Sequence, residues 1–148
     1  MSSVTFTAVP TPATADNNYS DFENITGSQV IGGSIFKAQL DLSHPLGWGF
    51  YDSEVPMFKR GVLIMNKSTN VFANPLVYSS DSLWSGYVPA EKLPLINDSA
   101  AIVISAVGQG MIVSFTDDPN FRGFWYGTNK LFLNSLFFGR IINSATAR

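Results

Sequence analysis

Two strongly apolar runs flank a Gly-Gln-Gly turn, and this pattern constrains the fold more narrowly than any other feature. Residues 100–107 (AAIVISAV) precede the turn and residues 111–116 (MIVSFT) follow it. Glycine reaches the positive φ values that tight turns require, so residues 108–110 predict a β-hairpin. The near-continuous apolar, β-branched character of the two runs predicts strands that are covered on both faces.

The pattern becomes helical after about Gly123 or Thr128 and ends near Phe138. Apolar positions cover more than half of the helix circumference, so we expect this helix to be largely buried. Gly139 is typical of a helix C-terminus. One predicted stripe holds Leu131, Asn134, Ser135 and Phe138, and the neighbouring one holds Trp125, Phe132, Leu136 and Gly139.

Shorter elements are expected between residue 31 and the hairpin. Residues 34–42 (SIFKAQLDL) alternate in the manner of a half-buried strand. Residues 93–96 predict either a brief helical turn or an extended segment. Further short strands are expected at residues 54–58, 62–65 and 76–78, and a weaker one at residues 85–88.

The composition is unusually poor in charge. A chain of 148 residues fits one domain with a sizeable core. Charged residues make up 14% of it, against about 25% in typical globular proteins. So few charges cover a surface poorly. The chain is therefore either an ordinary apolar domain or part of a larger body whose remaining surface belongs to a partner.

The first thirty residues differ in composition from the rest. They are rich in Thr, Ser, Ala, Pro and Asn, so we expect a flexible tail or linker over residues 1–30 and the folded domain over residues 31–148. No basic residue precedes Lys37 and no signal-like apolar stretch is present, so we expect no signal peptide. No apolar run approaches the roughly 18 residues of a membrane span.

Charge and residue counts argue against several classes of function. The net charge is −2 and the nine basic residues are scattered, which gives no electrostatic reason to expect nucleic-acid binding. There is no cysteine, so thiolate nucleophiles and cysteine-based metal sites are excluded. A catalytic zinc site usually uses two histidines, and this chain has one. We therefore expect no metal cofactor in the chain.

His44 is that single histidine, within residues 41–46 (DLSHPL). A serine hydrolase needs serine, histidine and aspartate side chains that converge in space. Residues so close together in an extended segment do not readily converge among themselves. We favour a structural histidine at a strand-to-turn junction, with His44 as the base of a serine hydrolase as an alternative.

Asp117, Asp118 and Arg122 lie just before the predicted helix. The two aspartates and Asn120 could bind calcium, but the segment matches no calcium loop, so we favour a turn that precedes the helix. Arg122, between two phenylalanines, could bind a carboxylate through two parallel hydrogen bonds. It could instead tie the loop to the aspartates or stack on an aromatic ring, and we favour this structural role.

Exposed aromatic side chains offer a further possibility. A sugar-stacking platform could be built from such residues, although burial in the core is the commoner outcome in so apolar a chain. The candidates are Trp48, Trp84, Tyr87, Trp125 and Tyr126.

Several segments resemble the C-terminal region of large bacterial secreted zinc carboxypeptidases of the carboxypeptidase A superfamily, roughly over residues 31–142. In that family this region looks like the latter half of a class I glutamine amidotransferase-like domain. The resemblance therefore implies a secreted or periplasmic α/β domain with a partial, flavodoxin-like mixed sheet, strand-rich, with a buried C-terminal helix. The segments are residues 32–41 (GGSIFKAQLD), 44–49 (HPLGWG), 55–58 (VPMF) and 120–132 (NFRGFWYGTNKLF), followed by Asn134 and residues 137–139.

The departures from that family limit what carries over. The peptidase zinc ligands and catalytic glutamate have no counterpart here, and the amidotransferase cysteine is absent. The resemblance thus implies a non-catalytic accessory domain, with zinc only in the parent peptidase. Its expected partner is the catalytic peptidase domain or the missing first half of the sheet. The alternatives are an independent glycan- or peptide-binding module and the serine hydrolase that uses His44.

Overall fold

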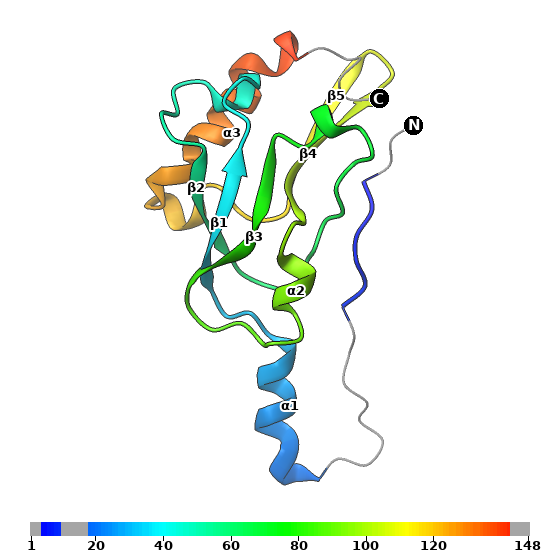
Figure 1. The fold of residues 1–148 in the computed structure, drawn as a ribbon, viewed down its shortest axis with the longest axis vertical. Coiled ribbons are helices and arrows are strands. Elements are labelled where there is room, and N and C mark those ends of the chain that lie inside the picture. Colours follow the sequence, from blue (N-terminus) through cyan, green and yellow to red (C-terminus); the bar gives the residue numbers. More distant parts are fainter. Residues whose placement is uncertain (1–3, 10–17, 143–148) are drawn as a thin grey trace.

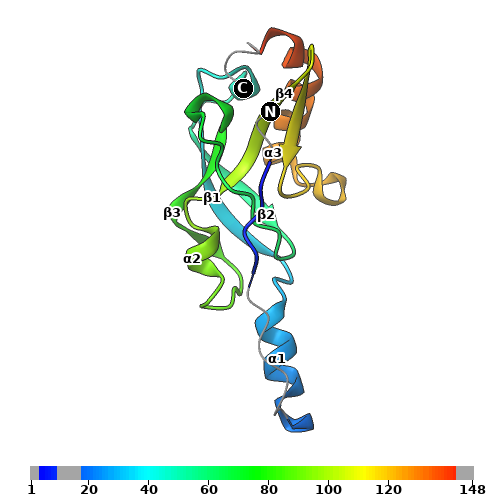
Figure 2. The ribbon, with the colours of Figure 1, turned by 90° about the vertical axis from the view of Figure 1, so that its right-hand side faces the viewer.

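The computed structural model describes residues 4–9 and 18–142, and their centre is one five-stranded antiparallel sheet (Figure 1). The strand order is β2-β1-β3-β4-β5, so β2 and β5 form the two edges. The sheet is curled rather than flat (Figure 2). The strands are β1 (Ser34–Leu40), β2 (Glu54–Lys59), β3 (Leu76–Ser85), β4 (Ala100–Val107) and β5 (Gly110–Phe115).

Three α-helices and several single 3₁₀ turns accompany the sheet. The α-helices are α1 (Phe22–Gln29), α2 (Leu93–Ile96) and α3 (Tyr126–Phe138). α3 packs against β2 and against the 3₁₀ turn η2 (Pro45–Gly47). None of the helices within the described residues is long and apolar enough to cross a membrane.

The coarse expectation of a strand-rich α/β fold with a C-terminal helix is confirmed, but the expected mixed sheet is not found. All four strand pairings of the sheet are antiparallel. Parallel neighbours need a crossover of a dozen or more residues, usually a helix, whereas the long helix α3 follows the last strand. The amidotransferase-like arrangement is therefore not confirmed.

The hairpin prediction is confirmed. β4 pairs with β5 up to Val107 opposite Gly110, and Gly108 takes a φ of +60° at the first of the two turn residues. Gln109, the second turn residue, has no positive φ, and this combination is the feature of a type II′ turn. Residues 100–105 are buried as expected, whereas β5 is only partly covered and Ile112 is exposed. The prediction that both strands are covered on both faces is right for β4 and wrong for β5, which is an edge strand.

The shorter elements follow the sequence in part. β1 alternates as predicted, with Phe36, Ala38 and Leu40 buried in the core. β3 extends to Ser85, well beyond the predicted residues 76–78, and residues 93–96 take the helical alternative. Residues 62–65 form no strand, only an isolated bridge pair at Met65.

Met65 also connects the N-terminal segment to the sheet, because it bridges both Phe6 and Ala100. The Thr7 backbone N–H donates to the Ile64 carbonyl at 2.9 Å. Further along, α1 extends away from the sheet in both ribbon views (Figures 1 and 2). The sequence predicted neither feature within residues 1–30. Residues 1–3 and 10–17 of the expected tail, and residues 143–148, lie outside the described residues.

α3 ends at Phe138 as predicted, but it is not largely buried. Its buried side chains are Thr128, Leu131 and Asn134, which lie on one stripe. Leu136 and Phe137 are 64% and 76% exposed. The reason is that β2 and η2 cover one side of the helix and no other described element forms a second layer. Gly139 keeps a right-handed helical conformation and begins a 3₁₀ turn.

Candidate functional site

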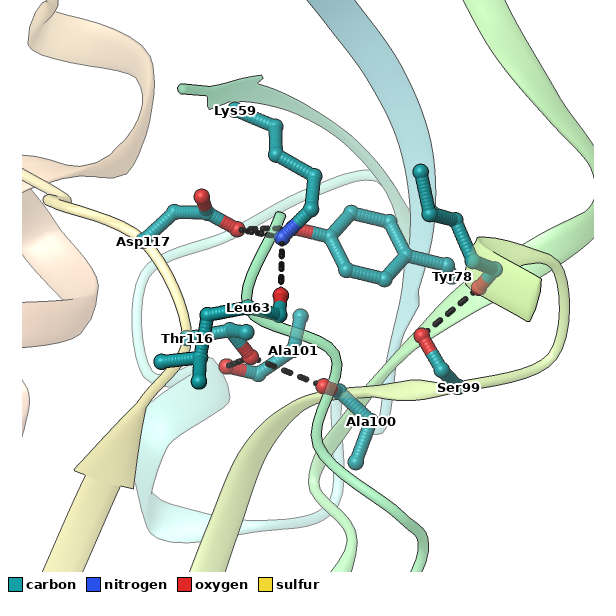
Figure 3. Close-up of polar contacts among 9 residues, drawn as sticks. Lys59, Leu63, Tyr78, Ser99, Ala100, Ala101, Thr116 and Asp117 are labelled. Atoms are coloured by element: carbon teal, nitrogen blue, oxygen red, sulfur yellow. Dashed lines mark hydrogen bonds and ion pairs between the residues drawn. The ribbon is translucent and has the colours of Figure 1, made fainter. Parts of the chain in front are cut away.

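A buried polar network joins the two edges of the sheet (Figure 3). Lys59 is the last residue of β2. Its side chain points into the core because side chains alternate along a strand, and Val55 and Met57 lie on the same buried face of β2. Its Nζ donates to Asp117 Oδ2 at 3.0 Å and to the Leu63 carbonyl at 2.8 Å. Tyr78, on the central strand β3, donates its hydroxyl to the same carboxylate oxygen.

Burial dominates the electrostatics of this network. The side chains of Lys59 and Asp117 are 1% and 2% exposed. Burial raises the pKa of the Asp117 carboxyl, although Lys59, Tyr78 and the Arg60 backbone N–H all oppose that rise. Burial and the neighbouring Asp117 charge raise the pKa of Tyr78, so its hydroxyl stays a donor. With no solvent access, the network supports the fold and has no room for a substrate.

The Thr116 hydroxyl and one backbone hydrogen bond beside this network fix the start of β4. Thr116 Oγ1 donates to the carbonyls of Ala100 and Ala101, at 2.8 and 3.0 Å (Figure 3). The Tyr78 backbone N–H donates to the Ser99 carbonyl at 2.9 Å. These bonds hold the start of β4 against both the end of β5 and β3, and so position Asp117 next to Lys59.

Asp118 faces away from this network. Its Oδ1 accepts the Asn120 backbone N–H at 2.8 Å in an exposed turn. Asp117 is occupied by Lys59 and Tyr78, so the structure does not direct the two neighbouring carboxylates to one point. Within residues 4–9 and 18–142, no cluster of three or more His, Asp or Glu side chains could hold a metal ion.

His44 caps the η2 turn. Its Nδ1 accepts the Leu46 backbone N–H at 3.1 Å, while its buried Nε2 has no hydrogen-bond partner. Burial lowers the pKa of the imidazole, against the opposing effect of Asp41. Ser43 donates its hydroxyl to Asp41 at 2.6 Å. In a hydrolase triad Nδ1 donates to the aspartate and Nε2 accepts from the serine, so these three residues do not form one.

A cleft lined by aromatic rings lies where β1, β2 and the loop before α3 meet, and we call it the aromatic cleft. Its volume is about 210 Å³. Phe58 stacks on Phe121 with ring centroids 3.9 Å apart, and Trp125 Nε1 donates to the Pro56 carbonyl at 3.2 Å. The lining residues are Gly33, Ser34, Ile35, Phe58, Ser85, Gly86, Phe121, Phe124 and Trp125.

Arg122 lies beside this cleft in an unusual backbone conformation. Its φ is +52°, in the left-handed region that residues with a Cβ rarely adopt. The guanidinium lies 5.2 Å above the Phe121 ring centroid. The exposed side chain makes no ion pair with any described carboxylate. Of the two structural roles expected for Arg122, stacking on an aromatic ring is found and a tie to Asp117 or Asp118 is not.

The other candidate aromatics are dispersed. No ring contact joins any two of the five residues proposed for a sugar-stacking platform. Trp48 contacts Phe138, with ring centroids 5.9 Å apart. Tyr126 lines a separate groove of about 360 Å³, together with Tyr51 and Lys130. Only Trp125 takes part in the aromatic cleft.

Among known proteins, no family model, curated protein or solved structure matches this chain.

Sequence reasoning missed three residues that organise these sites. Lys59 had a detectable signal, because it follows Val55 and Met57 at alternate positions of β2. Tyr78 and Phe58 had none. Each acts through a partner far away in the sequence: Tyr78 and Asp117 are separated by 39 positions.

Proposed function

We propose that this chain is a non-catalytic accessory domain that docks on a protein partner through the outer face of α3. We define this outer α3 face by Leu133, Leu136 and Phe137 of α3 together with Ile141 of the 3₁₀ turn that follows the helix, all of which are exposed. The observation that carries the proposal is that α3 is apolar on two sides. Leu131 is buried against the domain, while the outer face is open.

A helix with apolar residues around its circumference is normally buried between two layers. β2 and η2 provide one layer for α3. Lys130 is the only charged residue within the helix, and it is engaged in a hydrogen bond to the Gly49 carbonyl at 2.7 Å. The outer α3 face therefore has the chemistry of an interface, and its spacing of three and four residues forms a continuous stripe.

The resemblance to secreted zinc carboxypeptidases supplies the candidate partner. On this proposal the catalytic peptidase domain, with its own zinc, provides the second layer for α3, and the pair acts in a secreted or periplasmic setting. The domain would orient or supplement the peptidase and would bind no zinc itself.

Mixing the purified chain with a carboxypeptidase A-type catalytic domain from the same organism tests this proposal. We expect a complex in size-exclusion chromatography with light scattering, and its loss in a Leu136→Glu/Phe137→Glu variant. Tyr19→Glu is the control, because Tyr19 is an exposed aromatic residue in the turn that precedes α1. Failure of the unchanged chain to form a complex, or a complex that tolerates the double substitution, would contradict the proposal.

A second candidate function, an independent ligand-binding module, is favoured by a different observation. The aromatic cleft combines rings from two distant segments, and an exposed guanidinium lies over the ring of Phe121, one of its lining residues. This arrangement does not depend on the outer α3 face. Binding of small aromatic compounds by the isolated chain, followed by NMR, tests this second function.

A further inference from the structure

We propose that the aromatic cleft binds an apolar ring or branched side chain that carries a carboxylate, with the apolar group in the cleft and the carboxylate on Arg122. This inference rests on the second candidate function and names its ligand. The shared chemistry has two possible sources, a free aromatic acid or the C-terminal residue of a peptide.

The size and lining of the cleft select the apolar part of the ligand. Its volume of about 210 Å³ is below the roughly 300–1,000 Å³ of pockets for drug-sized molecules, so it accommodates one ring or one branched side chain. Phe124 is 56% exposed and contacts Phe121 edge to face, with ring centroids 6.0 Å apart. Such ring edges and faces favour a flat apolar guest over a strongly hydrated one.

The walls of the cleft are held in place before any ligand arrives. Phe58 stacks on Phe121, and the Trp125 indole is tied to the Pro56 carbonyl. Gly33 permits the close approach of Phe58, because a Cβ at that position would lie 2.8 Å from the Phe58 ring. A preorganised site loses less conformational entropy on binding, which favours a small ligand with few contacts.

Arg122 selects the charged part. The Arg122 guanidinium carbon lies 5.2 Å from the centroid of the Phe121 ring, and no described carboxylate forms an ion pair with it. This planar fork matches the two oxygens of a carboxylate. Backbone in the left-handed region persists only where the surroundings impose it, and it concentrates at functional sites. Here it holds an unpaired guanidinium next to an apolar cleft.

The start of α3 adds to the preference for an anion. α3 begins directly after Trp125, its N-terminus has no side-chain cap, and its first turn contains no acidic residue. The positive end of the helix dipole is therefore not neutralised by the chain itself. A single guanidinium in a chain of net charge −2 suits a monovalent carboxylate better than a multiply charged phosphate.

NMR titration of the isotope-labelled full chain tests the proposal, with the indole N–H of Trp125 as the reporter. The chain has three tryptophans, and Trp48 and Trp84 are not among the residues that line the cleft, so their indole signals are internal controls. The probes are N-acetylphenylalanine, its uncharged amide, phenylpropionate and an acetylated Gly-Gly-Phe peptide. We expect the acid to shift the Trp125 signal with a Kd of about 1 mM, the scale for so small a ligand.

Two variants test recognition of the ligand's carboxylate and of its apolar group separately. Arg122→Gln should weaken N-acetylphenylalanine about fivefold, as expected for loss of an exposed ion pair, and leave the amide unchanged. Phe124→Ala should weaken both probes. Arg140→Gln, which removes an exposed arginine elsewhere, is the matched control and should change neither.

Each outcome decides one part of the proposal. Equal binding of acid and amide overturns carboxylate recognition but retains the cleft as a ligand site. No movement of the Trp125 signal with any probe overturns both this inference and the second candidate function. Stronger binding of phenylpropionate indicates a free acid as the ligand, and stronger binding of the tripeptide indicates a peptide C-terminus.

Discussion

Lys59 Nζ lies 3.0 Å from Asp117 Oδ2, and this buried ion pair connects the two opposite edges of the sheet. Lys59 ends the edge strand β2, and Asp117 follows the other edge strand, β5, by two residues. Tyr78 reaches the same carboxylate from the central strand. The ends of the two edge strands meet because the sheet curls (Figure 2). The ion pair therefore holds the curled sheet together at its two edges without a covalent bond.

Lys59→Met tests this closure. The substitution leaves the Asp117 carboxylate buried without its counter-charge, and we expect it to lower the free energy of unfolding by about 3–5 kcal/mol near neutral pH. The loss should shrink as the pH falls, because a protonated Asp117 carries no charge to bury. Urea denaturation at several pH values measures both effects.

The exposed pair between Lys37 and Asp81 provides the control. Its atoms lie 3.2 Å apart, but the Asp81 side chain is 92% exposed. Lys37→Met should therefore cost no more than about 1 kcal/mol. Equal losses for the two lysine substitutions would show that burial of the Lys59 pair has no energetic consequence.

His44 should make the stability depend on pH. Burial lowers its pKa in the folded chain, so the unfolded chain takes up the proton first as the pH falls. Stability should therefore decrease as the pH falls through about 6.5, the ordinary histidine value, and level off below the folded-state pKa. Urea midpoints between about pH 7.5 and pH 5 report this dependence.

His44→Asn separates the titration from the cap. Asparagine is a good N-cap, so it can replace Nδ1 as the acceptor of the Leu46 N–H without titrating in this range. His44 is the only histidine, and any contribution from Asp117 is common to both proteins, so their difference isolates the imidazole. A parallel pH dependence in the two proteins would contradict the prediction.

Gly86→Ala should destabilise the fold by about 3 kcal/mol, from backbone strain and overpacking together. Gly86 has a φ of +104°, and an added Cβ would lie 2.9 Å from the Ser34 Cα and 2.6 Å from its hydroxyl oxygen. Gly139→Ala is the control, because Gly139 has a helical φ of −52° and open space around it. Thermal unfolding compares them, and a Gly86 variant as stable as the Gly139 variant would refute the argument.

Local chemistry made part of the fold predictable. The β4–β5 hairpin follows from a glycine turn between β-branched runs, and β1 follows from strict alternation. The length of β3 does not follow, because Ser80 and Asp81 within it are polar and exposed, and the strand is specified by pairing with β1. Burial of α3 was overestimated because an apolar pattern does not tell which side of a helix has a neighbour.

The candidate site was predictable only where its residues are close in sequence. Arg122 between Phe121 and Phe124 suggested stacking, and this contact forms. The other wall of the aromatic cleft, Phe58, comes from β2 and is brought there by packing of the loop before α3. No short-range pattern encodes such a pairing, which depends on the whole topology.

Asn134 illustrates the same limit, and it gives the last prediction. The sequence placed it on one stripe of the helix with Leu131, but did not predict its role. Its Nδ2 donates to the carbonyls of Leu46 and Trp48, at 2.8 and 2.9 Å, and so ties α3 to the η2 turn. Asn134→Leu removes both donors, and Asn134→Asp keeps the shape but places a carboxylate against the two carbonyls. Each should lower the free energy of unfolding by about 2–3 kcal/mol, since buried carbonyls lose their partners.

Ser135→Ala, which loses only an exposed bond within α3, should stay within about 0.5 kcal/mol of the unchanged chain in urea denaturation. An Asn134→Asp variant of unaltered stability would mean that packing, and not the two hydrogen bonds, holds α3 in place.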